Sequence, residues 1–128
     1  MIQRISPPGA PAPRGPYSPA VRAGDTVYVA GQISVDPISG EVIRGDVAVE
    51  TRQCLKNIQS ILEGCGATMG QVVRCGVYLT DAADFQAMNA VYAEFFGEAK
   101  PARTTIIVAA LPLAGAKVEI DAMAYLGS

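Results

Sequence analysis

The sequence contains no histidine, no tryptophan and few charges, since only 17% of its 128 residues are acidic or basic. The missing histidine removes the usual general base of enzymes, the Ser–His and Cys–His nucleophile systems and the commonest metal ligand. Any chemistry that this chain performs must therefore use carboxylates, arginine, tyrosine, backbone groups and water.

Cysteine is also scarce, and the three examples are Cys54, Cys65 and Cys75. Their number is odd, and their spacing matches no metal-binding or redox motif. Because each of them lies among apolar residues, we expect them to be buried free thiols.

An excess of positive charge is absent as well. The basic and acidic residues number 10 and 12, which gives a net charge of −2 and a pI of about 5.0. A nucleic-acid-binding surface needs a basic patch, so nucleic acid is not an expected partner. The apolar runs are too short to span a membrane, and Met1–Arg4 contains no apolar signal core. We therefore expect a cytoplasmic protein with no membrane partner.

Apolar side chains, by contrast, are abundant, at 50% of the residues. A chain of this length with this composition can bury a real core, so residues 1–128 are predicted to form one domain. The 13 glycines and nine prolines then indicate many turns, because a chain this apolar is not expected to be disordered.

Hydrophobic periodicity predicts two helices and a set of strands. The first helix spans residues 47–65, with Asp46 as its N-cap and Gly66 as its stop. Polar residues of this helix are expected to face away from the core, and they are Glu50, Gln53, Asn57, Ser60 and Glu63. The second helix follows Asp81 and ends at Gly97, with an inner stripe of Phe85, Met88, Tyr92 and Phe95. Strands are expected at 1–5, 20–22, 26–32 and 71–79, from Pro101 to Val108, and at 117–125.

The order of these elements predicts an α/β (α+β) fold with a mixed sheet. Two helical crossovers join three strands that should be parallel, with antiparallel strands added at both ends. Right-handed crossovers place both helices on one face, and the other face is expected to carry Arg103, Glu119 or their neighbours. A sheet face without helices needs a cover, so we expect the chain to oligomerise through it.

Arg103 stands at the start of a β-branched strand. Because side chains alternate along a strand, Arg103 and Thr105 share one face. An arginine among apolar neighbours is costly unless an anion meets it. The simpler explanation is a structural ion pair with Glu119 or Asp121, and the alternative is an anionic ligand.

Five motifs together resemble one family, and they are Gly15–Ser18, Val29–Ile33, Asn89–Phe96, Pro101–Thr104 and Val118–Ile120. In order and spacing they are similar to those of the Rid/YjgF family over nearly the whole chain. The resemblance implies a chorismate-mutase-like fold and a homotrimer with three clefts between subunits. It also implies hydrolysis of 2-iminopropanoate, 2-iminobutanoate and their enamine tautomers to 2-oxo acids and ammonia, without a cofactor or metal.

The resemblance also implies roles for individual residues. Arg103 would bind the substrate carboxylate, and Glu119 would place the water. The remaining contacts would come from the side chains of Tyr17 and Asn89 and from backbone groups of Gly31 and Thr105. From the residues alone, Tyr17 could equally be a packing residue, and Asn89 a solvated residue at the helix edge.

Two positions depart from the family pattern. Residue 30 is alanine where many members have serine, and residue 105 is threonine where many have cysteine. Threonine at position 105 keeps the same backbone N–H group that cysteine would have, whereas alanine at position 30 lacks the hydroxyl group of serine. This loss bears on the range of substrates more than on the type of reaction.

Three other functions remain possible from the sequence. The same arginine and glutamate would serve a deaminase for 3-aminoacrylate or 2-aminomuconate. A trimeric binding or regulatory protein without catalysis would need only the binding residues. A ribonuclease or translation inhibitor is disfavoured by the acidic charge balance and the missing histidine.

Overall fold

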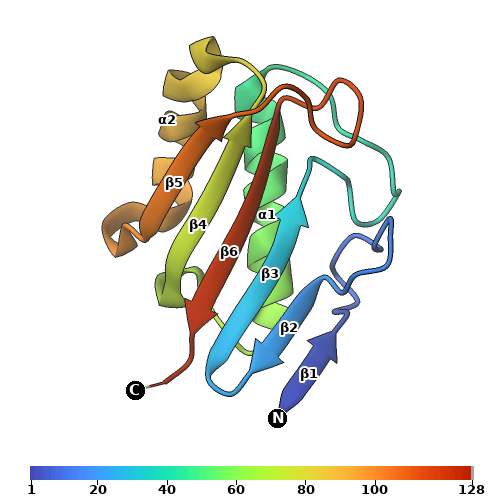
Figure 1. The fold of residues 1–128 in the computed structure, drawn as a ribbon, viewed down its shortest axis with the longest axis vertical. Coiled ribbons are helices and arrows are strands. Elements are labelled where there is room, and N and C mark those ends of the chain that lie inside the picture. Colours follow the sequence, from blue (N-terminus) through green and yellow to red (C-terminus); the bar gives the residue numbers. More distant parts are fainter. Residues whose placement is uncertain (128) are drawn as a thin grey trace.

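A computed structural model describes residues 1–127, which form a six-stranded sheet with two α-helices behind it (Figure 1). The sheet order is β1-β2-β3-β6-β4-β5. The strands are β1 (Ile2–Ile5), β2 (Ala20–Ala23), β3 (Thr26–Gln32), β4 (Val72–Leu79), β5 (Ala102–Ile107) and β6 (Val118–Tyr125). The helices are α1 (Val47–Gly64) and α2 (Phe85–Phe96), and short 3₁₀ turns flank β4 and α2.

Helix α1 begins and ends where its sequence signals predict. The Asp46 carboxylate accepts a hydrogen bond from the Val49 N–H at 3.0 Å and so satisfies one donor of the first turn. At the other end the Cys65 N–H donates to the Ile61 carbonyl. Gly66 follows with a φ of 77°, a left-handed conformation that favours glycine.

The last strand lies in the middle of the sheet, which corrects one prediction. β6 pairs antiparallel with both β3 and β4, and β4 pairs parallel with β5. The predicted common direction of β3, β4 and β5 is therefore confirmed, but β6 separates the first two instead of adding to an edge. One face of β6 consists of buried apolar residues, namely Val118, Ile120, Ala122 and Ala124. A strand with such a face gains hydrogen bonds and packing on both sides in a central position.

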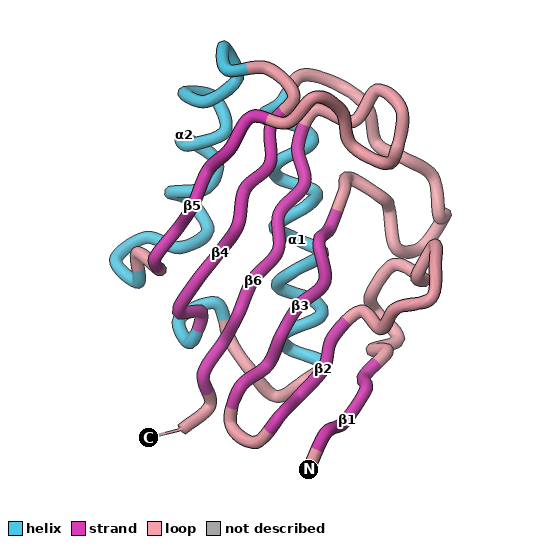
Figure 2. Tube along the Cα trace, viewed as in Figure 1, coloured by secondary structure: helices cyan, strands magenta, loops and turns pink. Residues whose placement is uncertain are grey.

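Both helices cover the same face of the sheet, as predicted (Figure 2). Helix α1 packs against β3 and β6 and against α2. Its core-facing side chains are Cys54, Leu55, Ile58, Ile61 and Leu62, all fully buried. The opposite face of the sheet, turned toward the viewer in Figure 1, carries no helix.

Two polar residues of α1 expected to face away are instead buried. Glu50 and Asn57 are each 1% exposed, because the loop of residues 33–46 and the start of β6 pass over this side of the helix. The Asn57 side-chain amide donates to the Val35 carbonyl at 2.8 Å, and Glu50 accepts the Lys117 N–H. Burial of these groups is tolerated because each meets the backbone of a covering segment.

The inner stripe of α2 also differs from the prediction at two positions. Phe85 is exposed and Phe95 is only partly buried. The buried residues of the helix are Met88, Val91, Tyr92 and Phe96. The helix lies at the β5 edge of the sheet, so its first turn extends beyond the core.

None of the helices formed by residues 1–127 combines the length and the apolar character needed to cross a membrane.

Candidate functional site

A cavity of about 450 Å³ opens where β3 ends and β6 begins. It is lined by Arg14, Tyr17, Ala30, Gly31, Ile33, Pro112, Leu113 and Glu119. Three of the site residues predicted from the sequence, Tyr17, Gly31 and Glu119, therefore come together in one place. The cavity has the size of a typical small-molecule site, with apolar walls and a few polar groups.

Glu119 points to the helix-free face of the sheet, as predicted. Burial, and the negative charge of Asp121 two residues on, raise the pKa of its carboxyl group. Such a carboxylate is a stronger base than an exposed glutamate, which suits it to take a proton from water.

Gly31 leaves the space that the Glu119 carboxylate occupies. A Cβ atom at position 31 would overlap the carboxylate of Glu119. The register of β3 against β6 shifts between Val29 and Gln32, so the irregularity of the ladder falls at this glycine. The strand and the carboxylate can therefore approach only because residue 31 has no side chain.

Tyr17 reaches the cavity from the proline-rich segment that precedes β2. Its hydroxyl oxygen accepts a hydrogen bond from the Arg14 N–H at 3.2 Å. The proton of the same hydroxyl is then free to donate toward the cavity. Tyr17 is thus a polar group with a fixed position, in agreement with a role in binding.

Arg103 lies on the other face of the sheet, which corrects its predicted placement. Its register partner on β4 is Cys75, a fully buried core residue, so the Arg103 side chain projects toward the helices. The guanidinium carbon lies 4.7 Å from the ring centre of Tyr92 and 5.7 Å from that of Phe85. Two aromatic rings of α2 therefore hold the cation through cation–π contacts.

The ion pair of Arg103 with Glu119 or Asp121 does not form. Within residues 1–127, Arg103 makes no ion pair with any carboxylate. Asp121 is occupied elsewhere, since it accepts hydrogen bonds from the Tyr78 hydroxyl and the Gly76 N–H, both at 2.8 Å. The positive charge of Arg103 is thus available to an anion from outside the chain.

Asn89 and Thr105 are placed on the same side as Arg103. Thr105 follows Arg103 on one face of β5, and Asn89 lies on α2 between Phe85 and Tyr92. In the described part of the chain, the side-chain oxygens of Asn89 and Thr105 are buried and have no hydrogen-bond partner. Such groups are costly to leave unpaired, so they indicate a place where a further polar group binds.

The six predicted residues therefore form two groups rather than one. The cavity group contains Tyr17, Gly31 and Glu119, whereas the β5 group contains Arg103, Asn89 and Thr105. The sheet itself separates Arg103 from Glu119, because alternate residues of neighbouring strands point to opposite faces.

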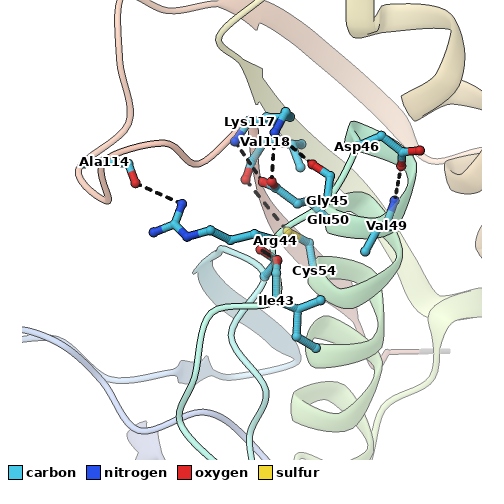
Figure 3. Close-up of polar contacts among 11 residues, drawn as sticks. Ile43, Arg44, Gly45, Asp46, Val49, Glu50, Cys54, Ala114, Lys117 and Val118 are labelled. Carbon is cyan, nitrogen blue, oxygen red and sulfur yellow. Dashed lines mark hydrogen bonds and ion pairs between the residues drawn. The ribbon is translucent and has the colours of Figure 1, made fainter.

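The start of β6 is fixed from α1, directly before Glu119 (Figure 3). The Glu50 carboxylate accepts the Lys117 N–H at 2.8 Å and lies 3.6 Å from the Lys117 ammonium group. That ammonium group also donates to the Gly45 carbonyl at 2.8 Å. These contacts hold the backbone that carries Glu119 in place.

A second contact joins the two loops at this end of the sheet. The Arg44 guanidinium donates to the Ala114 carbonyl at 3.1 Å, so the loop before α1 lies against the loop before β6 (Figure 3). Pro112 and Leu113, which line the cavity, belong to the second of these loops. The loop contact therefore helps to shape the cavity wall.

Sequence reasoning assigned no role to four cavity residues, namely Arg14, Ile33, Pro112 and Leu113. Arg14 had a signal, because it lies three positions before Tyr17 in a segment already expected to cross the surface. The two loop residues have no signal in the sequence, since a loop path depends on tertiary contacts.

No three side chains of cysteine, aspartate or glutamate gather into a potential metal site within residues 1–127. All three cysteines are free and buried, as expected. Burial raises the pKa of Cys54 and that of Cys75, so both are held as neutral thiols.

Comparison with known proteins identifies the family. The model of the family described as Endoribonuclease L-PSP matches residues 8–126. The chain belongs to this family, which is the Rid/YjgF family indicated by the motifs. A RutC family protein of Pyrococcus horikoshii is 48% identical over 125 residues, 98% of each chain. A Bos taurus protein named 2-iminobutanoate/2-iminopropanoate deaminase is 46% identical over 123 residues, 96% of this chain and 89% of that one.

Solved structures agree with the fold described above. A putative endoribonuclease from Thermotoga maritima superposes with a TM-score of 0.95 at 38% identity, covering 100% of both chains. RidA from the Antarctic bacterium Psychrobacter sp. superposes with a TM-score of 0.91 at 41% identity, covering 96% of this chain and 98% of that one. The mixed α+β architecture is thus shared with known members of the family.

Proposed function

We propose that this protein hydrolyses 2-imino acids such as 2-iminopropanoate and 2-iminobutanoate, together with their enamine tautomers, to 2-oxo acids and ammonia. The names of several relatives support this reaction. The observation that carries the proposal is a cavity with a basic carboxylate, Glu119, in a chain whose Arg103 has no internal anionic partner among residues 1–127.

We further propose a chorismate-mutase-like homotrimer in which each site lies between two subunits. Arg103 and Glu119 point to opposite faces of one sheet, so they can meet around one substrate only if a second copy supplies one of them. The helix-free face also carries exposed apolar side chains, such as Tyr28 and Ile106. Covering these side chains with another copy would bury apolar surface.

In the proposed reaction, Arg103 holds the substrate carboxylate. A guanidinium group binds a carboxylate through two parallel hydrogen bonds and so fixes orientation as well as affinity. Tyr92 and Phe85 restrict the guanidinium before substrate arrives, which reduces the loss of freedom on binding. Asn89 and Thr105 supply the buried polar atoms next to the bound acid.

Glu119 acts as the general base of the proposed reaction. It takes a proton from water as the oxygen attacks the C=N carbon, and the electron pair of that bond moves to nitrogen. The resulting carbinolamine receives the proton back on its amino group. Its C–N bond then breaks to release ammonia, the C=O bond of the 2-oxo acid forms, and the hydroxyl proton passes to the Glu119 carboxylate. In this proposal the Gly31 carbonyl accepts a hydrogen bond from the iminium N–H, and the Tyr17 hydroxyl donates to the attacking water.

A trapping assay tests the reaction. An amino-acid oxidase generates the imine from alanine or 2-aminobutanoate in the presence of semicarbazide, and an active protein lowers the amount of trapped adduct. Arg103→Ala should restore the adduct to its level without protein, whereas Arg22→Ala, a partly exposed arginine of β2, should act as wild type. Equal competition by Arg103→Ala and wild type would exclude Arg103 as the anchor.

The same assay, with the imine or enamine varied, compares other substrates that would react by the same chemistry. Greater activity on 3-aminoacrylate or 2-aminomuconate would place the physiological substrate there. Saturable binding of a 2-oxo acid without ammonia release would instead indicate a binding or regulatory protein. The family description names endoribonuclease activity, and incubation with labelled RNA at several salt concentrations tests it directly.

A further inference from the structure

We propose that Arg14 forms a second carboxylate-binding group in the Glu119 cavity, so that the preferred substrates are 2-imino acids with an acidic side chain. This inference rests on the proposed function and specifies its substrate class. The five-carbon dicarboxylic imine, which derives from glutamate, is the representative substrate.

Arg14 belongs to the cavity wall together with Tyr17 and Glu119. Its guanidinium donates to the Gly40 carbonyl at 2.9 Å, which uses one of the five N–H donors of the group. Its backbone N–H holds the Tyr17 hydroxyl at 3.2 Å. One hydrogen bond thus holds the Arg14 side chain, and a second joins the Arg14 backbone to Tyr17 in the cavity wall.

No carboxylate of the described chain neutralises Arg14. The ion pairs formed among residues 1–127 join Arg22 to Asp25, Arg52 to Glu94 and Lys117 to Glu50. The remaining donors of Arg14 are therefore available to a ligand. A planar guanidinium with one donor committed to a carbonyl can still present a pair of N–H groups to a carboxylate.

The cavity is larger than the smallest proposed substrates require. Its volume of about 450 Å³ exceeds the space taken by an acid of three or four carbons. Ile33, Pro112 and Leu113 provide an apolar wall against which methylene groups of a longer side chain can pack. A side chain with an apolar stem and an anionic end matches this wall and the cation beside it.

The negative charge of Glu119 determines which ligand side chains need Arg14. A second anion beside this carboxylate would be repelled unless a cation compensated for it. Arg14 is the cation that the same chain contributes to this wall, since its other lining residues apart from Glu119 are uncharged, and Arg103 of the neighbouring copy is committed to the first carboxylate of the substrate. A long apolar substrate would fill the same space but would gain nothing from Arg14.

Calorimetry with two product acids of equal chain length tests the inference. Wild type should bind 2-oxoglutarate about tenfold more tightly than 2-oxopentanoate, because only the former has a second carboxylate for Arg14. Arg14→Gln should abolish this preference. Arg22→Gln should keep it, and it is a matched control because Arg22 also donates to a glycine carbonyl, that of Gly24, at 2.9 Å.

Two results would overturn the inference: equal affinities in wild type, or a preference that persists in Arg14→Gln. The trapping assay separates this failure from failure of the proposed function. Hydrolysis of imines without a preference for the diacid would reject the proposed role of Arg14 but not the proposed enzymatic activity. A preference for the diacid without any hydrolysis would support the proposed role of Arg14 and reject the proposed enzymatic activity.

Discussion

Two influences raise the pKa of the Glu119 carboxyl group, first its burial and then a nearby negative charge. Asp121 lies two residues on along β6 and adds negative charge on the same face, while the surrounding structure removes water. Both effects disfavour the ionised carboxylate and raise its pKa. Asp121 itself is engaged by Tyr78 and Gly76, which leaves Glu119 as the carboxylate that faces the cavity.

Replacing Glu119 should make the protein more stable and less active. Glu119→Gln removes the proposed general base, and the rate of imine hydrolysis should fall by about 10²–10⁴-fold. The pKa of the Glu119 carboxyl group is higher in the folded protein than in the unfolded chain. The protonated group therefore stabilises the fold fully at pH values below the pKa of the unfolded chain, and this stabilisation is lost as the pH rises through the pKa of the folded protein. The glutamine variant should therefore unfold at higher urea concentration than wild type at neutral pH.

The same gain should vanish in acid. At about pH 3.5 the carboxyl group is protonated in both folded and unfolded chains, so glutamine has no advantage. Urea unfolding at the two pH values measures the difference. A gain of equal size at both values, or a loss at neutral pH, would contradict the assigned environment of Glu119.

Local sequence is sufficient to propose candidate site residues, but not to say which face of the sheet they occupy. Alternation along β5 correctly groups Arg103 with Thr105. Whether that group points to the helices depends on its register against Cys75 and Val77 of β4, which no local pattern encodes. The separation of Arg103 from Glu119 could therefore not be predicted.

At the scale of elements, the anchoring of β6 by α1 determines where Glu119 lies. Glu50→Ala leaves the partly buried Lys117 N–H without its acceptor, and should lower the free energy of unfolding by about 1–3 kcal/mol. Glu50→Gln keeps an acceptor oxygen for this N–H and removes the carboxylate charge beside Lys117, so it should lower the free energy of unfolding by less than Glu50→Ala does.

Urea unfolding of the two variants checks this ranking, with Glu63→Ala on the exposed side of α1 as the control. That control should stay within about 0.5 kcal/mol of wild type. Equal losses for Glu50→Ala and Glu50→Gln would show that the N–H acceptor is not the stabilising feature.

The close approach of β3 to Glu119 supplies a second test at this scale. Gly31→Ala introduces a Cβ atom into the space of the Glu119 carboxylate, and should displace it. Displacement of a catalytic group by about 1 Å costs on the order of 10²-fold in rate. Gly70→Ala is the matched control, since its Cβ would meet nothing closer than 3.7 Å.

Steady-state rates and thermal unfolding of both glycine variants provide the measurement. Gly31→Ala should remain folded but lose activity, and Gly70→Ala should remain both folded and active. Full activity in Gly31→Ala would mean that the position of the carboxylate is not critical.

Element types could be predicted from the sequence, whereas their order in the sheet could not. The caps Asp46 and Gly66 and the helical periodicity between them correctly define α1. The central place of β6 depends on pairing between residues nearly a hundred positions apart, such as Val27 with Ala124. Burial of Glu50 and Asn57 escapes prediction for the same reason, because distant segments cover them.

At the scale of the whole molecule, one chain contains both halves of the proposed site, and they lie on opposite faces of its sheet. The cavity with Glu119 opens on the helix-free face, and Arg103 lies with the helices at the β5 edge. The buried unpaired oxygens of Asn89 and Thr105 support a role for that edge in contacting something beyond the chain. The central claim is therefore that two copies share each site.

Mixing two inactive variants tests this claim most directly. Arg103→Ala and Glu119→Gln are unfolded together, refolded at equal concentrations and assayed for imine hydrolysis, with the double variant refolded in the same way as the control. If neighbouring copies supply the two residues, random trimers should recover about one quarter of wild-type activity. If both residues act from the same chain, the mixture should remain as inactive as either variant alone.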